Sequence, residues 1–241
     1  TFTPAEMQEV VAVVGRDMFT DELRETLGQF EQAKNFGSLI MPKLRDPAET
    51  LRVVEARDFG GDLLLKEVQE RVLAVLRMAE ALSPKYHVVV ANPPYMGAKS
   101  MDSALSEFAR AQYPDSRFDL FAMFMERALS VSRKHATVGM VNMQGWMFAS
   151  SLEGLRSKIL SNASIATMAH IGTRGFDTIS GEVVSTTAFT LFSGGRRDLQ
   201  GIYLRLVDGR SEAEKARLAK SAISNGTNMY SFSTAEIEKI P

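Results

Sequence analysis

The chain has 241 residues, of which 45% are hydrophobic and 24% charged, and its formal net charge is −1 at pH 7. The lack of cysteine excludes a disulfide framework, a thiolate nucleophile and a cysteine zinc site. The three histidines, at positions 87, 135 and 170, match no metal-ligand spacing. No apolar run approaches the roughly 20 residues of a membrane span and no signal peptide is visible, so we expect a cytoplasmic protein without a membrane partner.

The first 83 residues predict four helices. Residues 3–6 read Thr-Pro-Ala-Glu, a capping box with proline at the first helical position, and Asp46-Pro47 opens the third helix. The second helix is expected over 21–34 and the fourth over about 62–82, because apolar residues recur there every three or four positions. We interpret residues 1–83 as a helical insertion or connection rather than a catalytic unit.

From residue 86 onward, predicted strands and helices alternate, which is typical of a doubly wound α/β sheet. The strands are expected at 86–91, 136–143, 165–171 and 183–192, and a further segment at 201–207 adds an edge or leads onward. The helices between them are expected at about 102–111, 119–133 and 151–161. The first strand is continuously apolar, which predicts a buried parallel strand.

Asn92-Pro93-Pro94-Tyr95 follows that strand directly. Two consecutive prolines end the ladder and force a rigid, extended exit, which presents the Asn92 amide, the Pro93 carbonyl and the Tyr95 ring together. Open α/β sheets bind ligands at this carboxyl edge. Amide and carbonyl oxygens both accept from an NH2 group, and a tyrosine ring stacks on a planar heterocycle. A plain turn needs neither the asparagine nor the ring, so the tetrapeptide predicts a site for the amino group of a flipped-out adenine.

The tetrapeptide resembles motif IV of the amino-group DNA methyltransferases, whose adenine-specific members carry Asn/Asp-Pro-Pro-Tyr/Phe/Trp. Its surroundings, residues 92–101, 116–129 and 139–148, are similar to the large adenine methyltransferases of bacterial phage-defence systems of the BREX type. The resemblance implies methyl transfer from S-adenosyl-L-methionine to adenine in double-stranded DNA, in phage defence or restriction-modification. Other phage-defence proteins are further partners that it implies.

The resemblance also assigns the motif its roles. Asn92 and the Pro93 carbonyl would accept hydrogen bonds from the adenine amino group, and Pro94 completes the rigid catalytic segment. Tyr95 would stack on the extruded base, which offsets part of the few kcal/mol that flipping costs. Phe176 matches the phenylalanine that precedes the antiparallel strand of the family and would bind the base, although it also fits a loop aromatic that closes the core.

Charged residues near the motif have two interpretations each. Lys99 is a candidate for substrate binding through a DNA phosphate, as are Arg110, Arg117 and Arg174, and each also fits a solvated surface charge. Asp119 begins the helix after the motif, where it fits either an ordinary N-cap or a cofactor-binding role.

The resemblance implies the later half of a Rossmann-like methyltransferase sheet, in which 183–192 is the antiparallel strand. The family binds its cofactor through a glycine-rich loop after its first strand, typically Asp-Pro-Xaa-Cys-Gly-Xaa-Gly, and no segment matches it. Gly60-Gly61 lacks the strand–glycine–helix context. We therefore expect a fragment in which 84–210 is a partial catalytic core, 211–241 connects to a missing region, and the isolated chain is inactive.

Two alternative functions remain open. Protein-glutamine methyltransferases use a similar tetrapeptide to hold a side-chain amide, and methylation of DNA against a peptide separates the two. A non-catalytic DNA-binding or complex-assembly module is the second alternative. The net charge of −1 is low for a DNA enzyme, because phosphate neutralisation demands a basic surface. This favours a DNA-gripping region outside the chain or an asymmetric distribution of charge.

Overall fold

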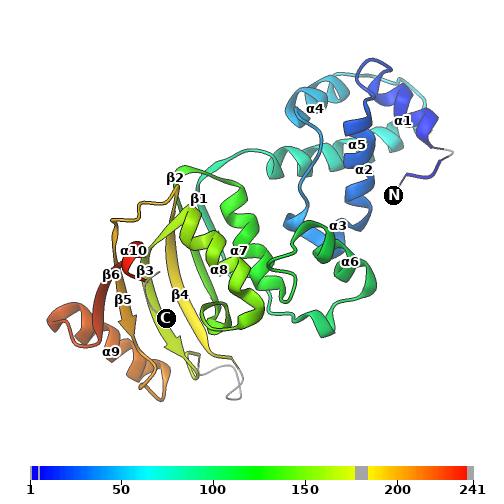
Figure 1. The fold of residues 1–241 in the computed structure, drawn as a ribbon. Coiled ribbons are helices and arrows are strands. Elements are labelled where there is room, and N and C mark those ends of the chain that lie inside the picture. Colours follow the sequence, from blue (N-terminus) through cyan, green and yellow to red (C-terminus); the bar gives the residue numbers. More distant parts are fainter. Residues whose placement is uncertain (1, 5, 177–183, 238–241) are drawn as a thin grey trace. The chain divides into compact units, whose positions relative to one another are not determined.

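The computed structural model describes residues 2–4, 6–176 and 184–237. It divides into two compact units, Thr1–Pro84 and Lys85–Pro241 (Figure 1). Among the residues described, no helix is both long and apolar enough to cross a membrane.

In its described residues, the regular structure of the first unit consists of helices alone. All four predicted helices are present, and the second is shorter than expected because it passes into a 3₁₀ turn at Phe30–Gln32. Val10, Leu23 and Val72 lie without exposure in the core between them. The helices are α1 (Met7–Val14), α2 (Asp21–Gln29), the short α3 (Ala33–Phe36), α4 (Pro47–Glu55) and α5 (Leu63–Leu82).

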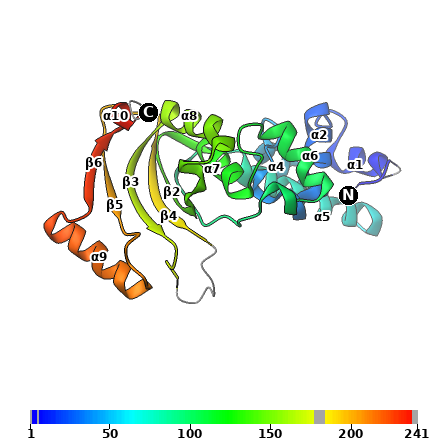
Figure 2. The same cartoon turned by 60° about the horizontal axis from the view of Figure 1, so that its bottom comes forward.

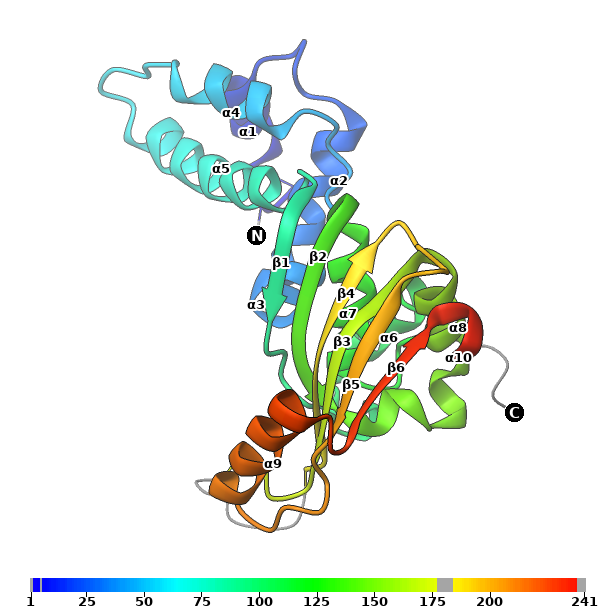
Figure 3. The ribbon, with the colours of Figure 1, turned by 90° about the vertical axis from the view of Figure 1, so that its left-hand side faces the viewer.

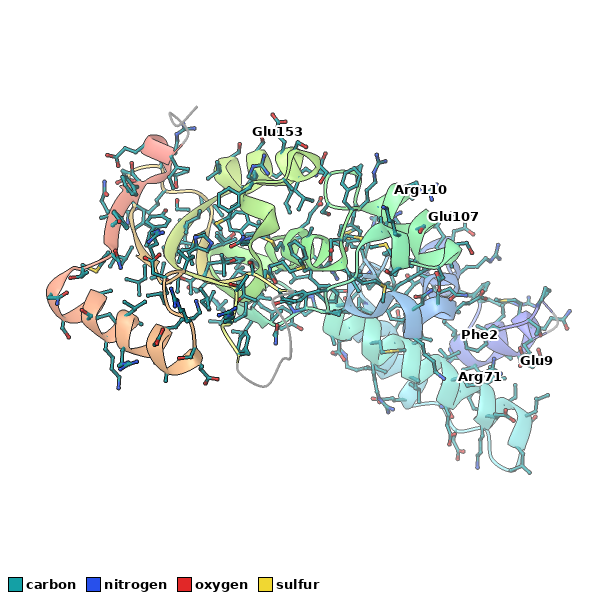
Figure 4. The ribbon with its side chains drawn as sticks, turned by 90° about the horizontal axis from the view of Figure 1, so that it is seen from below. Phe2, Glu9, Arg71, Glu107, Arg110 and Glu153 are labelled. Carbon is teal, nitrogen blue, oxygen red and sulfur yellow. The ribbon has the colours of Figure 1, made fainter. Side chains whose placement is uncertain are left out.

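The predicted capping box forms, one turn ahead of α1. The Thr3 backbone N–H donates to Glu6 Oε2 at 2.7 Å and the Glu6 N–H donates to Thr3 Oγ1 at 3.3 Å. Arg71 joins this group, because its Nη1 lies 2.6 Å from Glu6 Oε1 and its guanidinium lies 4.6 Å from the centre of the Phe2 ring (Figure 4). The hydrogen bonds from Arg71 and Thr3 lower the pKa of Glu6 to about 2.

The second unit contains a six-stranded mixed sheet in the order β1-β2-β4-β3-β5-β6 (Figure 3). The pairs β1–β2 and β3–β5 are parallel, and β4 is antiparallel to both of its neighbours. The α/β class and the antiparallel strand that the sequence predicts are therefore confirmed. The strands are β1 (Tyr86–Ala91), β2 (Ser132–Met143), β3 (Ala163–Gly172), β4 (Thr186–Ser193), β5 (Gln200–Arg205) and β6 (Met229–Ser233).

Helices α7 and α8 cover one face of this sheet (Figures 1 and 2). Phe121 and Met125 of α7 and Leu155 of α8 are buried there against Val138 and Phe189 of the strands. This core fixes the start of α7. The helices of the unit are α6 (Ser103–Gln112), α7 (Leu120–Ser130), α8 (Glu153–Asn162), α9 (Glu212–Asn225) and the short α10 (Thr234–Ile237).

The prediction that the first strand is buried is wrong. Val88 is 61% and Val90 78% exposed. Within the described chain β1 is the edge of the sheet and pairs only with β2, and both valines lie on the face opposite α7 and α8. Val89 and Ala91, on the other side of the same strand, pack against the core. An apolar run therefore predicts the strand correctly, but it does not predict whether other elements bury both faces of that strand.

The carboxyl-terminal part also differs from the prediction. The strand expected at 201–207 is confirmed as β5, but it lies inside the sheet because β6 pairs with it. Residues 211–241, expected as a connection toward a missing region, contain α9 and β6, two elements for which no prediction was made. Strand β2 begins at Ser132, inside the helix expected at 119–133, because α7 ends at Ser130.

Gly201 is expected to tolerate no side chain. A Cβ atom there would lie 2.3 Å from the carbonyl oxygen of Ile165 on the neighbouring strand. Backbone cannot rotate away as a side chain does, so we expect Gly201→Ala to lower the free energy of unfolding by about 1–3 kcal/mol. Gly145→Ala is the control, since no described atom lies within 4 Å of its Cβ position. Denaturant unfolding of both variants is the measurement, and equal stabilities would contradict the clash.

Candidate active site

A hollow of about 220 Å³ lies at the carboxyl edge of the sheet, where β1, β2 and β3 end and the antiparallel β4 begins. It is small beside the roughly 300–1,000 Å³ of sites for drug-sized ligands, and suits a single planar heterocycle. Its lining residues are Asn92, Tyr95, Val141, Arg174, Gly175, Phe176, Val184 and Thr186.

Asn92 stands immediately beyond the last paired residue of β1. Pairing with β2 ends at Ala91, opposite Met140, and the following prolines supply no backbone N–H to continue it. The Asn92 side chain is exposed and makes no hydrogen bond to the described part of the chain. Pro93 is buried and Pro94 is exposed, and neither proline is among the lining residues of the hollow. The segment therefore presents the Asn92 amide, unengaged, on a rigid support.

Tyr95 is held at both ends of its side chain. Its hydroxyl donates to the carbonyl oxygen of Val141 at 3.3 Å, and its ring meets the ring of Phe121 edge to face, with centroids 6.1 Å apart. Burial raises the pKa of the Tyr95 hydroxyl, which therefore keeps its proton as a donor. Tyr95 nevertheless remains 36% exposed and lines the hollow, so an accessible part of a fixed aromatic ring is available to a ligand.

Phe176 lines the same hollow and is 42% exposed. The structure thus brings together three of the residues singled out in the sequence, Asn92, Tyr95 and Phe176, from segments more than 80 positions apart. Arg174 joins them, with a backbone φ of 56°, an unusual conformation for a residue other than glycine.

Four lining residues carry no signal in the sequence: Val141, Gly175, Val184 and Thr186. Val141 and Thr186 belong to β2 and β4, and the antiparallel register that pairs Val141 with Ala188 and Met143 with Thr186 brings them to the hollow. Whether a strand residue lines a cavity depends on which strands lie beside it in the sheet. The alternation of β2 alone therefore offers no way to single out Val141.

Lys99 and Asp119 lie outside the lining of the hollow. Lys99 is exposed in the 3₁₀ turn Ala98–Ser100. Asp119 is the N-cap of α7, and its Oδ1 accepts from the backbone N–H groups of Phe121 at 3.3 Å and Met96 at 3.1 Å. Burial raises the pKa of Asp119, and these hydrogen bonds partly oppose that shift. In the part of the chain that the structure describes, no three His, Asp or Glu side chains form a metal site.

Residues 23–176 match the profile of the Eco57I restriction-modification methylase family. This range is more than half of the chain and includes both the helical segment from α2 onward and the motif, and the chain belongs to that family.

Two curated relatives are similar over most of the chain. The adenine-specific methyltransferase BrxX of Escherichia coli O9:H4 (strain HS) is 43% identical over 199 residues, which are 81% of this chain and 16% of that protein. The adenine-specific methyltransferase PglX of Lacticaseibacillus casei (strain Zhang) is 36% identical over 237 residues, 94% of this chain and 20% of that protein. The chain therefore spans about a fifth or less of the length of these relatives. The resemblance to adenine methyltransferases of the BREX type is thereby confirmed.

Among solved structures, the Type ISP restriction-modification enzyme LlaGI, a nuclease-deletion mutant in complex with a DNA substrate mimic, aligns with a TM-score of 0.49 and 14% identity. The alignment covers 80% of this chain and 18% of that one.

Proposed function

We propose that this chain holds the target base in an adenine-specific DNA methyltransferase of phage defence or restriction-modification. The reaction transfers a methyl group from S-adenosyl-L-methionine to the exocyclic amino group of an adenine flipped out of double-stranded DNA. The observation that carries the proposal is the hollow in which the unengaged Asn92 amide and the rings of Tyr95 and Phe176 meet. The two relatives described above, both named adenine-specific methyltransferases, support it.

In this proposal, Asn92 and Pro93 hold the nucleophile. The side-chain oxygen of Asn92 and the carbonyl oxygen of Pro93 accept the two N–H groups of the adenine amino group. The backbone that carries both acceptors is rigid, because proline restricts φ to about −65°. Acceptors placed in this way pull the nitrogen toward tetrahedral geometry and localise its lone pair for attack. The proton leaves after the methyl group has arrived, so the step needs no general base of unusual pKa.

Tyr95 and Phe176 hold the plane of the base. Base–aromatic stacking contributes about 1–3 kcal/mol per base, which compares with the few kcal/mol that extrusion costs. The Tyr95 ring is already oriented for stacking, because its contacts with the Val141 carbonyl and the Phe121 ring hold it in place. Arg174, at the rim of the same hollow, and Lys99, on the turn after the motif, are proposed to contact the DNA backbone.

The residues of the hollow fit the base and not the whole methyl donor. A hollow of about 220 Å³ suits one heterocycle, and among its described lining residues there is no carboxylate to take the ribose hydroxyls of S-adenosyl-L-methionine. The proposed division of labour is therefore that these residues hold adenine, while the main contacts to the methyl donor come from elsewhere in the enzyme.

The test uses the full-length protein with double-stranded DNA and S-adenosyl-L-methionine labelled in its methyl group. We expect label in N6-methyladenine, measured by mass spectrometry after digestion of the DNA. A glutamine-containing peptide is the parallel substrate. Label in the peptide and not in the DNA would replace the proposal with protein-glutamine methylation, and label in neither would refute both.

A further inference from the structure

After the motif, the chain makes an excursion whose first and last residues pair with each other. We call this pairing the neck and define it as Met96–Ala98 paired with Phe118–Leu120. The Leu120 N–H donates to the Met96 carbonyl at 3.0 Å, and the Ala98 N–H donates to the Phe118 carbonyl at 2.9 Å. Between these bonds, Gly97 and Asp119 form an antiparallel bridge. The chain thus returns to the residue next to Tyr95 after an excursion that contains α6.

Asp119 closes this neck with its side chain. A single oxygen, Oδ1, accepts from the Met96 N–H at 3.1 Å and from the Phe121 N–H at 3.3 Å. One acceptor is an ordinary N-cap bond to the first turn of α7. The other reaches across to the backbone of the residue that follows Tyr95. Capping α7 requires only the bond to Phe121, so the bond to Met96 is an additional interaction that capping does not explain.

The first turn of α7, which Asp119 joins to Met96, is held rigidly in place. Leu120 and Phe121, the first two residues of α7, are 7% and 3% exposed, and Phe121 belongs to the core of the sheet unit. Phe121 also contacts the Tyr95 ring edge to face. The first turn of α7 therefore holds the motif at two points: the backbone of Met96 through Asp119, and the ring of Tyr95 through Phe121.

We infer that Asp119 is a positioning residue for the proposed reaction. Its side chain fixes the backbone after Tyr95 and thereby the orientation of the Asn92 and Tyr95 side chains. This rests on the function proposed above. Asp119 lies outside the lining of the hollow proposed to hold the base, and its effect on the motif passes through Met96. Loss of the bond to Met96 leaves α7 and the sheet in place but releases the exit of the motif, so it lowers turnover more than it lowers substrate binding.

The test compares four variants of the full-length enzyme. Asp119→Ala removes both bonds, and Asp119→Ser keeps a capping hydroxyl for α7 but is one atom too short for the bond to Met96. Asp119→Asn keeps an oxygen in the place of Oδ1. Asp102→Ala is the matched control, because Asp102 is the N-cap of α6 in the same excursion, where it accepts from the Leu105 N–H at 2.7 Å.

We expect kcat for DNA methylation to fall on the order of 10²-fold in Asp119→Ala and Asp119→Ser, the loss that a displacement of about 1 Å can cause. KM for DNA and the melting temperature should stay close to those of Asp102→Ala, and Asp119→Asn should retain most of the activity. Asp119→Ser is informative even where Asp119→Ala does not fold, because it keeps the cap.

Three results overturn the inference. Asp119→Ser with the kcat of Asp102→Ala would show that the cap alone matters. Asp119→Asn, folded but as impaired as Asp119→Ser, would show that the negative charge acts and not the hydrogen bonds. A wild-type enzyme that methylates no DNA would refute the proposed function, and the inference with it.

Discussion

Replacing Asn92 by alanine is expected to lower kcat for adenine methylation on the order of 10²–10³-fold, the loss that follows removal of one pre-organised polar group at a reacting centre. The fold should be unaffected. The side chain is exposed and makes no hydrogen bond to the described residues, so its removal leaves no buried group unpaired. We expect the free energy of unfolding to change by no more than about 0.5 kcal/mol.

Asn92→Asp is the matched control for this prediction, because a carboxylate keeps an acceptor oxygen at the same place and the adenine-specific family carries either residue there. Single-turnover methylation with saturating S-adenosyl-L-methionine separates chemistry from DNA binding. Asn92→Ala with a rate near that of the wild type would remove Asn92 from the reaction.

The second large effect is expected at Tyr95. Tyr95→Ala removes the stacking surface and should weaken binding of DNA with an extruded base by about 1–3 kcal/mol. Tyr95→Phe keeps the ring and its contact with Phe121, and loses only the hydrogen bond of 3.3 Å to the Val141 carbonyl. Loss of that hydrogen bond should weaken binding of the same DNA by about 0.5–1.5 kcal/mol at most.

Titration of DNA that carries 2-aminopurine at the target position measures both variants, since the fluorescence of the base reports its removal from the stack. The order wild type, Tyr95→Phe, Tyr95→Ala is the expected order of affinity. Equal impairment of the two variants would assign the effect to the hydroxyl and contradict the stacking account.

The sequence predicts those features of the fold that depend on local chemistry. The apolar stretch and the two prolines determine where β1 ends, and the prediction of 86–91 agrees with the strand Tyr86–Ala91. The Asp46-Pro47 pair places the start of α4 equally well. Each of these signals lies within a few residues of the boundary that it determines.

Features that depend on distant partners were not predicted. The exposure of Val88 and Val90 depends on what lies beyond β1, and the apolar stretch carries no information about it. The short strand β6 exists because β5 offers it an edge, from Gln200 opposite Ser233 to Leu204 opposite Met229. The second bond of Asp119 is similar: its position predicts the cap on α7, but only the folded chain brings Met96 within reach.

The neck has a consequence for how proteins of this family diverge. Because Met96 and Leu120 are joined by a backbone hydrogen bond, the length of chain between them does not enter the spacing of Asn92 and Tyr95. The entropy of closing such a loop grows only slowly with its length, by about 0.6 kcal/mol per doubling. Insertions at the exposed positions beside α6 are thus expected to cost little stability and to leave the spacing within the motif unchanged.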